Sequence, residues 1–380
     1  MRILLVGEYS RLHNSLKEGL IRLGHEVTLV SSGDGFKGYP SDYSFGNSFT
    51  QTNFGRISER VLRRLFGYDL NRFERGFRFK KILKNLKGYD VVQLINEATI
   101  NTFPDLELKL LKQLSAQNKK MFLLCSGADY MTVSFLMKRT LPYSMLDPYF
   151  ENPEKLKHQF EYVFNFLSSD HKKIHDYLYQ NVNGVIATDL DYVYPLKGNP
   201  EFIGLIPNPV NLEKIDFKPI EIVGKVVIFL GINRHTYYAK GIPYFELALA
   251  EIKYAYADKV EIVVVENMPY ADYIKAYDRA HILLDQVYST DQGYNALEAM
   301  AAGKVVFTGG GSEFMEQFGL NERVVIDAAP NVETLVSELQ KLIENPGEIT
   351  AIGKRARSFV EKEHDLEQIA LRYLGTWKSH

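Results

Sequence analysis

A glutamate near the start of a short predicted helix has the clearest chemical potential in this chain. Glu298 lies in the segment 290–306, TDQGYNALEAMAAGKVV, which predicts a glycine turn, a helix, and a strand over 304–308. A helix that begins near Gly293 would direct unpaired backbone N–H groups at a phosphate or a sugar hydroxyl. A carboxylate at Glu298 could accept two hydrogen bonds from a cis-diol such as ribose. The segment therefore predicts a nucleotide-binding helix, and the alternative is an ordinary helix with an exposed glutamate.

Two pairs of residues have the spacing of metal ligands, but neither predicts a metal site. Asp189 and Asp191 form an Asp-x-Asp pair, and N-capping of the following helix by Asp189 explains that pair equally well. His171 and His175 have i, i+4 spacing that could place both on one face of a helix, but the sequence identifies no third ligand, so we expect a solvated or capped pair rather than a zinc site. We therefore expect no bound metal and no prosthetic group.

The elements that must position these residues alternate between short apolar runs and helical patterns. The runs that predict strands are 2–6, 27–31, 90–95, 120–125 and 184–188, followed by 225–231, 260–265, 281–284, 305–308 and 323–326. Short buried strands separated by helices predict parallel sheets covered on both faces.

The strand–helix pattern breaks between about Pro207 and Lys225. We therefore predict an N-terminal domain over 1–207, a linker over 208–224, a second domain over 225–362, and a terminal helical segment over 363–380. A chain of 380 residues suits two such domains.

The composition indicates a soluble globular protein of a reducing compartment. Hydrophobic residues make up 46% and charged residues 24% of the chain, and the single cysteine excludes an internal disulfide. The first apolar run is too short for a signal peptide, and no run approaches the roughly 18 residues of a spanning helix. We expect a cytoplasmic protein, or one bound peripherally to the inner face of the cytoplasmic membrane.

The segment around Glu298 resembles the donor-site signature of GT-B glycosyltransferases, especially the retaining family 4 type. That signature is a glutamate, seven residues, a second glutamate, and Ala-Met-Ala-x-Gly. Other stretches that resemble motifs of this family are DVVQL at 90–94, SGAD at 126–129, IPNPV at 206–210, and GINR at 231–234 with Lys240-Gly241. The resemblance implies an α/β GT-B fold, with two Rossmann-like domains whose parallel sheets face across a cleft. It also implies that the terminal helix packs back on the first domain.

The resemblance also assigns roles to individual residues. It implies donor binding by Asp285, Gln286, Thr290, Asp291, Gly293, Tyr294, Asn295 and Glu298, and sugar or acceptor contacts by Ser126, Gly127 and Asp129. Arg234 and Lys240 would lie beside the diphosphate of a nucleotide sugar. Because negative charge grows there as the glycosidic bond breaks, two fixed cations would stabilise the transition state more than the ground state, without a metal. The alternative is that both side chains are simply solvated.

These features predict a hexosyl- or N-acetylhexosaminyltransferase that uses a UDP- or GDP-sugar, with retention, and a saccharide, lipid-linked or small-molecule acceptor. Thr290 stands where the signature has its first glutamate, and Ser126 stands where many members have histidine. A nucleotide-sugar epimerase or hydrolase of the same fold, and a catalytically silent sugar-nucleotide-binding subunit, are therefore alternatives. A dinucleotide site is disfavoured because the turn after Gly7 lacks the Gly-x-Gly-x-x-Gly spacing.

The segment 56–87 holds eleven lysines and arginines against three acidic residues, interleaved with aromatic residues. It predicts either a plain solvated helix or a contact with an anionic membrane or acidic acceptor, in which Arg60, Arg63, Arg64, Arg72 and Arg75 face the partner. Nucleic acid is not expected as a partner, because the chain has a net charge of only −2.

Overall fold

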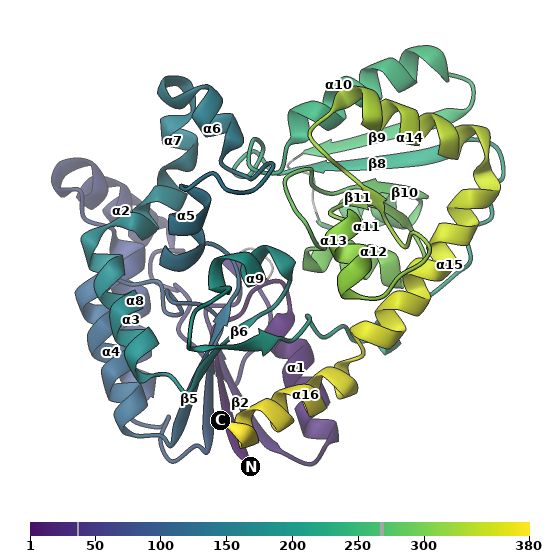
Figure 1. Ribbon diagram of the computed structural model, residues 1–380. Coiled ribbons are helices and arrows are strands. Elements are labelled where there is room, and N and C mark those ends of the chain that lie inside the picture. The colour runs from purple at the N-terminus through teal and green to yellow at the C-terminus, as the bar shows by residue number, and fades with distance from the viewer. Residues whose placement is uncertain (36–37, 267–269) are drawn as a thin grey trace. The chain divides into compact units, whose positions relative to one another are not determined.

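Two parallel sheets organise the chain, and each belongs to its own compact unit (Figure 1). The computed structural model describes residues 1–35, 38–266 and 270–380. Unit 1 consists of Met1–Phe135, Tyr162–Pro209 and Leu366–His380, and unit 2 consists of Leu136–Glu161 and Val210–Asp365.

The sheet of unit 1 has the strand order β3-β2-β1-β4-β5-β6-β7, and its neighbouring strands are parallel. The strands are β1 (Arg2–Val6), β2 (Glu26–Ser31), β3 (Tyr43–Ser44), β4 (Val91–Leu94), β5 (Lys120–Cys125), β6 (Gly184–Ala187) and β7 (Phe202–Leu205). Alternate residues of β1 enter different hydrophobic cores, with Ile3 and Leu5 in one and Leu4 and Val6 in the other. The strand is therefore buried on both faces, which explains its continuous apolar run.

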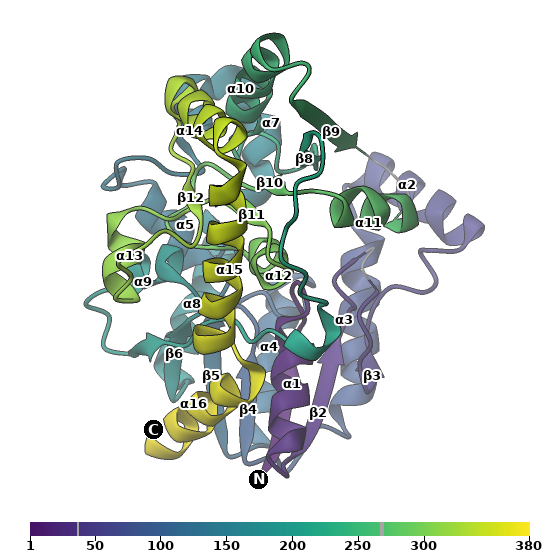
Figure 2. The ribbon, with the colours of Figure 1, turned by 90° about the vertical axis from the view of Figure 1, so that its right-hand side faces the viewer.

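Helices cover both faces of this sheet. The helices of unit 1 are α1 (Leu12–Arg22), α2 (Asn53–Phe66), α3 (Leu70–Leu83), α4 (Pro104–Ala116), α5 (Tyr130–Leu136), α8 (Ser169–Asn181), α9 (Leu190–Leu196) and α16 (Leu366–Ser379). Both ribbon views show α16 beside α1 (Figures 1 and 2). Its Tyr373 and Trp377 are buried in the same core as Ile3 and Leu5, and the Trp377 indole N–H donates to Gln93 Oε1 at 3.0 Å.

The sheet of unit 2 has the order β12-β11-β10-β8-β9, again with parallel neighbours. Its strands are β8 (Val226–Ile232), β9 (Val260–Glu266), β10 (Ile282–Leu284), β11 (Val305–Thr308) and β12 (Ile326–Asp327). Its helices are α6 (Asp147–Glu151), α10 (Ile242–Ala255), α11 (Tyr270–Asp278), α12 (Tyr294–Ala301), α13 (Ser312–Gln317), α14 (Val332–Glu344) and α15 (Pro346–Glu363), and α7 (Pro153–Phe164) begins in this unit. The predicted α/β class with two sets of parallel strands is confirmed.

Two details differ from the sequence pattern. Residues 136–161 were expected in the first domain, yet their contacts group them with unit 2. The strand expected over 323–326 is reduced to the two residues of β12. No helix in the described ranges combines the length and apolar character needed to cross a bilayer.

Candidate functional site

Helix α12 begins where the sequence predicted, at the residue after Gly293. Gly293 has an extended backbone at the N-cap position, and no side chain caps the helix within the described residues. A helix start without a side-chain cap is the end of a helix that favours anions. The preceding loop is anchored by Gln292, whose Nε2 donates to the Gly309 carbonyl at 2.7 Å and whose backbone N–H donates to Asp291 Oδ1 at 2.7 Å.

A buried carboxylate and a lysine meet close to the start of α12. Asp285 follows the last residue of β10, and its Oδ1 accepts a hydrogen bond from Lys240 Nζ at 2.9 Å. Its Oδ2 is buried and has no hydrogen-bond partner among the described residues. A Cβ added to Gly293 would lie 3.9 Å from that Oδ2 and 3.9 Å from Gln286 Nε2. The two side chains at the end of β10 thus reach the start of α12, and Lys240 is held in the same place.

The backbone around Lys240 explains why its position is fixed. Its carbonyl accepts from the Val287 N–H at 2.9 Å, which ties the loop before α10 to the segment after β10. Gly241 follows with φ +69°, and a Cβ there would lie 2.6 Å from Val287 Cβ. Glycine is needed at this position because both the left-handed backbone and the close approach exclude a side chain.

Arg234 is engaged elsewhere. Its Nε and Nη2 donate to the two carboxylate oxygens of Glu266 at 2.7 and 2.6 Å, and its guanidinium lies 4.7 Å from the centre of the Tyr237 ring. The hydrogen bonds to Glu266 raise the pKa of Arg234 and lower the pKa of Glu266. The described contacts therefore link Lys240 with Asp285, and Arg234 with Glu266. The acidic partner at the end of β9 was not foreseen from the sequence.

The remaining predicted donor residues lie on α12 and in the loop before it. Asn295 is exposed and Glu298 is half-buried, and their i, i+3 spacing places them on one face of the helix. Tyr294 and Asp291 are buried, and Thr290 is half-buried.

Sequence reasoning missed the loop after β11, where three consecutive glycines precede α13. A Cβ on Gly309 would overlap the backbone of the loop before α12, so this glycine permits the two loops to touch. Thr308 Oγ1 and Gln292 Oε1 are buried beside this contact and, like Asp285 Oδ2, have no hydrogen-bond partner among the described residues. A glycine run between a strand and a helix was the available signal.

In unit 1, the predicted Asp129 belongs to a buried polar cluster at the ends of β4 and β5. Its Oδ1 accepts from the Thr132 N–H at 2.6 Å, and Cys125 Sγ lies 3.1 Å from its Oδ2. Burial, together with the nearby charge of Glu97, raises the pKa of Asp129 to about 7. This carboxyl group can therefore exchange a proton near neutral pH.

Gly127 and Ser126, the two residues predicted beside Asp129, form hydrogen bonds through their backbones. The Gly127 N–H donates to the Tyr192 hydroxyl at 2.6 Å, and the Ser126 carbonyl accepts from Asn96 Nδ2 at 2.9 Å. Ser126 is buried.

A carboxylate–histidine pair completes the cluster and was not predicted. Glu97 Oε1 lies 2.6 Å from His175 Nδ1, and Glu97 Oε2 accepts from the Tyr130 N–H at 3.1 Å. The centre of the His175 ring lies 4.8 Å from the centre of the Tyr130 ring and 4.2 Å from that of the Tyr179 ring. The sequence grouped His175 with His171 as a solvated or capped pair. That is wrong for His175, which is buried, whereas His171 Nδ1 lies 2.9 Å from the helix-capping Ser168 Oγ.

The carboxylates and histidines do not assemble into a metal centre in the part of the chain that the structure describes. Asp189 occupies the N-cap position of α9, but its side chain forms no capping hydrogen bond.

Comparison with known proteins identifies the fold of this chain. Residues 219–375, most of unit 2 and part of α16, match the family described as Glycosyl transferase-like. Among solved structures, sucrose-phosphate synthase from Thermosynechococcus elongatus is 16% identical with a TM-score of 0.62, covering 100% of this chain and 98% of that one. HepE from Anabaena, in complex with UDP and glucose, is 13% identical with a TM-score of 0.60 over 100% of both chains. The chain has the GT-B fold.

Enzymes of another reaction type share this GT-B fold. The UDP-GlcNAc 2-epimerase from Neisseria meningitidis, bound to UDP-GlcNAc, is 12% identical with a TM-score of 0.51 over 100% of both chains. No curated protein sequence matches this chain. The fold alone therefore does not choose between transfer and epimerisation.

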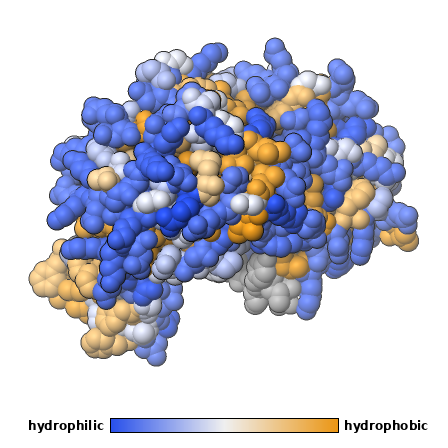
Figure 3. Space-filling model, turned by 90° about the horizontal axis from the view of Figure 1, so that it is seen from below, coloured by the Kyte–Doolittle hydropathy of each residue, from blue (hydrophilic) through white to orange (hydrophobic). Residues whose placement is uncertain are grey.

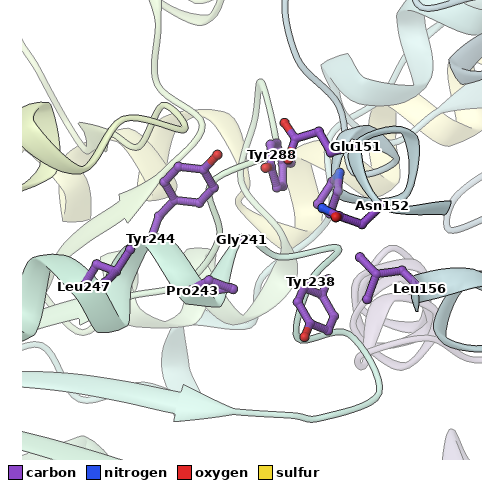
Figure 4. A pocket seen from close by; sticks show the side chains of 10 residues that line it. Glu151, Asn152, Leu156, Tyr238, Gly241, Pro243, Tyr244, Leu247 and Tyr288 are labelled. Atoms are coloured by element: carbon purple, nitrogen blue, oxygen red, sulfur yellow. The ribbon is translucent and has the colours of Figure 1, made fainter. Parts of the chain in front are cut away.

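Unit 2 of this GT-B chain also contains a tyrosine-lined cavity of about 310 Å³ next to the Lys240 loop (Figure 4). In Figure 4, Tyr244 lies on one side of the cavity and Asn152 on the other, with Tyr238 and Tyr288 between them; Gly241, Pro243, Leu247, Pro148, Glu151 and Leu156 also line it. Burial and a hydrogen bond with Tyr244 raise the pKa of Tyr288. The rings and hydroxyls of these two tyrosines suit a sugar.

Proposed function

We propose that this protein is a glycosyltransferase that binds the nucleoside diphosphate of its donor sugar in unit 2. The observation that carries the proposal is Lys240, held by Asp285 close to the uncapped start of α12. The family match over 219–375 supports a transferase, and the complexes of HepE with UDP and with UDP-glucose support a uridine nucleotide.

The diphosphate would accept hydrogen bonds from the first turn of α12 and from Lys240 Nζ. An ammonium group has three donors, and Asp285 uses one of them, so the others can reach phosphate oxygens. As the glycosidic bond breaks, its electron pair passes to the β-phosphate oxygen, and Lys240 stabilises the charge that develops there. Asp285 Oδ2 is available to accept a hydrogen bond from a donor hydroxyl.

Arg234 would supply the second cation only after releasing Glu266. The Arg234 side chain is half exposed, and water screens an exposed ion pair, so a diphosphate dianion can compete with Glu266 for the guanidinium. Two protein cations would make a metal unnecessary, and we propose metal-independent transfer for this reason.

Glu298 would accept hydrogen bonds from the ribose hydroxyls. The exposed Asn295 on the same helical face, together with Thr290, Asp291, Tyr294, Gly293 and Gln286, would surround the nucleotide and its sugar. We propose retention of anomeric configuration and a hexosyl or N-acetylhexosaminyl group, which the resemblance of the α12 segment to retaining enzymes supports.

The acceptor would be a saccharide or a lipid-linked saccharide. The cavity beside Lys240 offers three tyrosine rings against which a sugar ring can stack, and its volume of about 310 Å³ suits one or two sugar units. Ser126, Gly127 and Asp129 of unit 1 are the other proposed acceptor or sugar contacts. We place the reaction in the cytoplasm.

A nucleotide-sugar epimerase or hydrolase is the second candidate. The observation that favours it is Asp129, whose pKa is raised to about 7 close to the buried Glu97–His175 pair, because such reactions require a group that exchanges a proton near neutral pH.

A thermal-shift screen of UDP, GDP and ADP, each with EDTA and with Mg²⁺, tests the donor assignment. We expect UDP at a hundredfold excess over its dissociation constant to stabilise the protein by about 2.7 kcal/mol, equally in EDTA. Stabilisation that requires Mg²⁺ would contradict the role given to the two cations.

Incubation of the donor sugar with and without saccharide acceptors then separates the candidates. Transfer requires an acceptor, an epimerase or hydrolase converts the donor alone, and a silent subunit binds the donor without turnover. Activity without any acceptor would overturn the transferase proposal.

A further inference from the structure

Helix α2 exposes an apolar stripe that its own unit leaves uncovered. Phe54, Ile57, Val61 and Leu65 recur at intervals of three and four residues, and each side chain is 47–71% exposed. Gly55 is the one residue of α2 that is buried. A surface helix normally turns such a stripe to the core.

The apolar stripe of α2 is part of a wider patch of exposed hydrophobic side chains. Half of the strongly exposed large hydrophobic side chains in the described residues lie within 49–77, including Phe66 and the stacked rings of Phe73 and Phe77. In Figure 3, hydrophobic colours gather on the part of unit 1 at the lower left, where α2 lies. Contiguous apolar surface of this kind marks an interaction site.

A basic stripe runs beside the apolar one. Arg56, Arg60 and Arg64 each precede a member of the apolar stripe by one residue, so they form a second line at i, i+4 and i+8. All three are exposed, and none pairs with an acidic side chain among the described residues. A helix with adjacent apolar and arginine faces is the form that lies in a membrane interface.

Other cations of the segment 56–87 are already engaged. Arg63 pairs with Glu59 and Asp69, whereas Arg72 and Arg75 donate to backbone carbonyls. Arg56, Arg60 and Arg64 of the basic stripe are therefore better placed to meet a partner than Arg63, Arg72 and Arg75.

The structure also holds α2 in place. Thr52 caps its start by accepting from the Gly55 N–H at 3.0 Å, and Gly67 ends it in a left-handed conformation. Glu74 of α3 accepts from the backbone N–H groups of Ser48, Phe49 and Thr50, which fixes the loop that leads into α2. The apolar stripe is therefore a preformed surface rather than a loose segment.

We propose that α2 binds the interface of an anionic membrane, with the apolar stripe at the acyl boundary and the basic stripe among the headgroups. An anionic lipid surface complements both stripes at once. A second copy of this patch would bring the same arginines together, which like-charge repulsion opposes. The inference does not depend on the proposed function, because α2 belongs to unit 1 and the donor residues belong to unit 2.

Co-sedimentation with vesicles tests this proposal. We expect the full chain to pellet with phosphatidylcholine vesicles containing about one third phosphatidylglycerol, to pellet far less with phosphatidylcholine alone, and to be released by salt. Changing Arg56, Arg60 and Arg64 to glutamine should lower the partition coefficient by about a hundredfold or more. Changing Lys253, Lys354 and Lys378 to glutamine removes the same charge elsewhere and should leave pelleting nearly unchanged.

The apolar stripe is tested separately with Ile57→Ser/Leu65→Ser and with Leu65→Trp. The double variant should lose at least about tenfold in partitioning, whereas Leu371→Ser, an exposed leucine of α16, should not. The single native tryptophan, Trp377, is fully buried, so Leu65→Trp adds an exposed reporter whose emission should shift to the blue on anionic vesicles. No pelleting of the wild type at low salt, or an unshifted emission, would overturn the proposal. Concentration-dependent dimers that the stripe variants abolish would show instead that a second copy covers the stripe.

Discussion

In the proposed site, Lys240 and Glu298 would contact different parts of the donor, so their loss should have different kinetic signatures. Lys240→Ala should lower kcat by about 10²–10³ with a smaller effect on nucleotide affinity, because its charge is needed most in the transition state. Glu298→Gln should chiefly weaken UDP binding, because the ribose hydroxyls lose a charged acceptor. Steady-state kinetics and calorimetric titration with UDP measure the two effects, with Lys253→Ala as the control. Equal losses of kcat and affinity in both variants would refute this division.

Because Glu266 holds Arg234, removing the Glu266 carboxylate should increase the affinity of the protein for UDP. Glu266→Gln should release the guanidinium that is now held at 2.6 and 2.7 Å, and so tighten UDP binding several-fold at low salt. Glu261 lies on the same strand and pairs with Arg279, so Glu261→Gln serves as the control. Unchanged affinity in Glu266→Gln would place Arg234 outside the donor site.

The raised pKa of Asp129 predicts that the free energy of unfolding depends on pH. Its pKa is raised in the folded state, so folding favours the protonated form, and its contribution is lost as pH rises from about 4 through about 7. Asp129→Asn mimics the protonated form, and its unfolding free energy should fall less steeply with pH in this range, by up to about 1.4 kcal/mol per pH unit. Urea denaturation at several pH values measures the difference. Parallel curves for the two proteins would contradict the raised pKa.

At the scale of elements, the loop before α10 joins the donor residues to the tyrosine cavity. Tyr288→Ala and Tyr244→Ala should raise the KM for a saccharide acceptor about tenfold and leave the UDP thermal shift unchanged, because a stacked aromatic ring is worth roughly 1 kcal/mol. Tyr254→Ala removes an exposed tyrosine near the end of α10 and should change neither quantity. A loss of UDP binding in the cavity variants would assign the cavity to the donor instead.

The sequence predicted those helices and strands that a local pattern of residues determines. Buried parallel strands such as β1 and β5 are continuous apolar runs, and the glycine before α12 marks its start. Contacts between distant segments have no such signature. Glu97 and His175 are 78 positions apart, and Arg234 and Glu266 are 32 apart, so neither pair could be read from spacing. The sequence also could not predict that the apolar stripe of α2 is exposed, because the same periodicity normally indicates a buried face.

At the scale of the whole molecule, the two units divide the proposed work. The proposed donor residues lie in unit 2, and Ser126, Gly127 and Asp129 lie in unit 1 with the α2 patch. The sequence predicted a break between about Pro207 and Lys225 and placed 136–161 in the first domain, whereas the contacts group 136–161 with unit 2. A helical pattern does not reveal which sheet a helix will pack against.

The packing of α16 in unit 1 has a consequence for folding during synthesis on the ribosome. Trp377 is bonded to Gln93 across 284 positions, and between them the chain builds all of unit 2. At about 5–20 residues per second, Gln93 would wait roughly 14–57 seconds for Trp377 of the helix that covers this face of the sheet. During that interval the apolar side chains of β1, β4 and β5 that later meet Tyr373 and Trp377 are open to nascent-chain chaperones. Unit 2, apart from its short segment 136–161, is made from one continuous stretch of chain and can complete its core first.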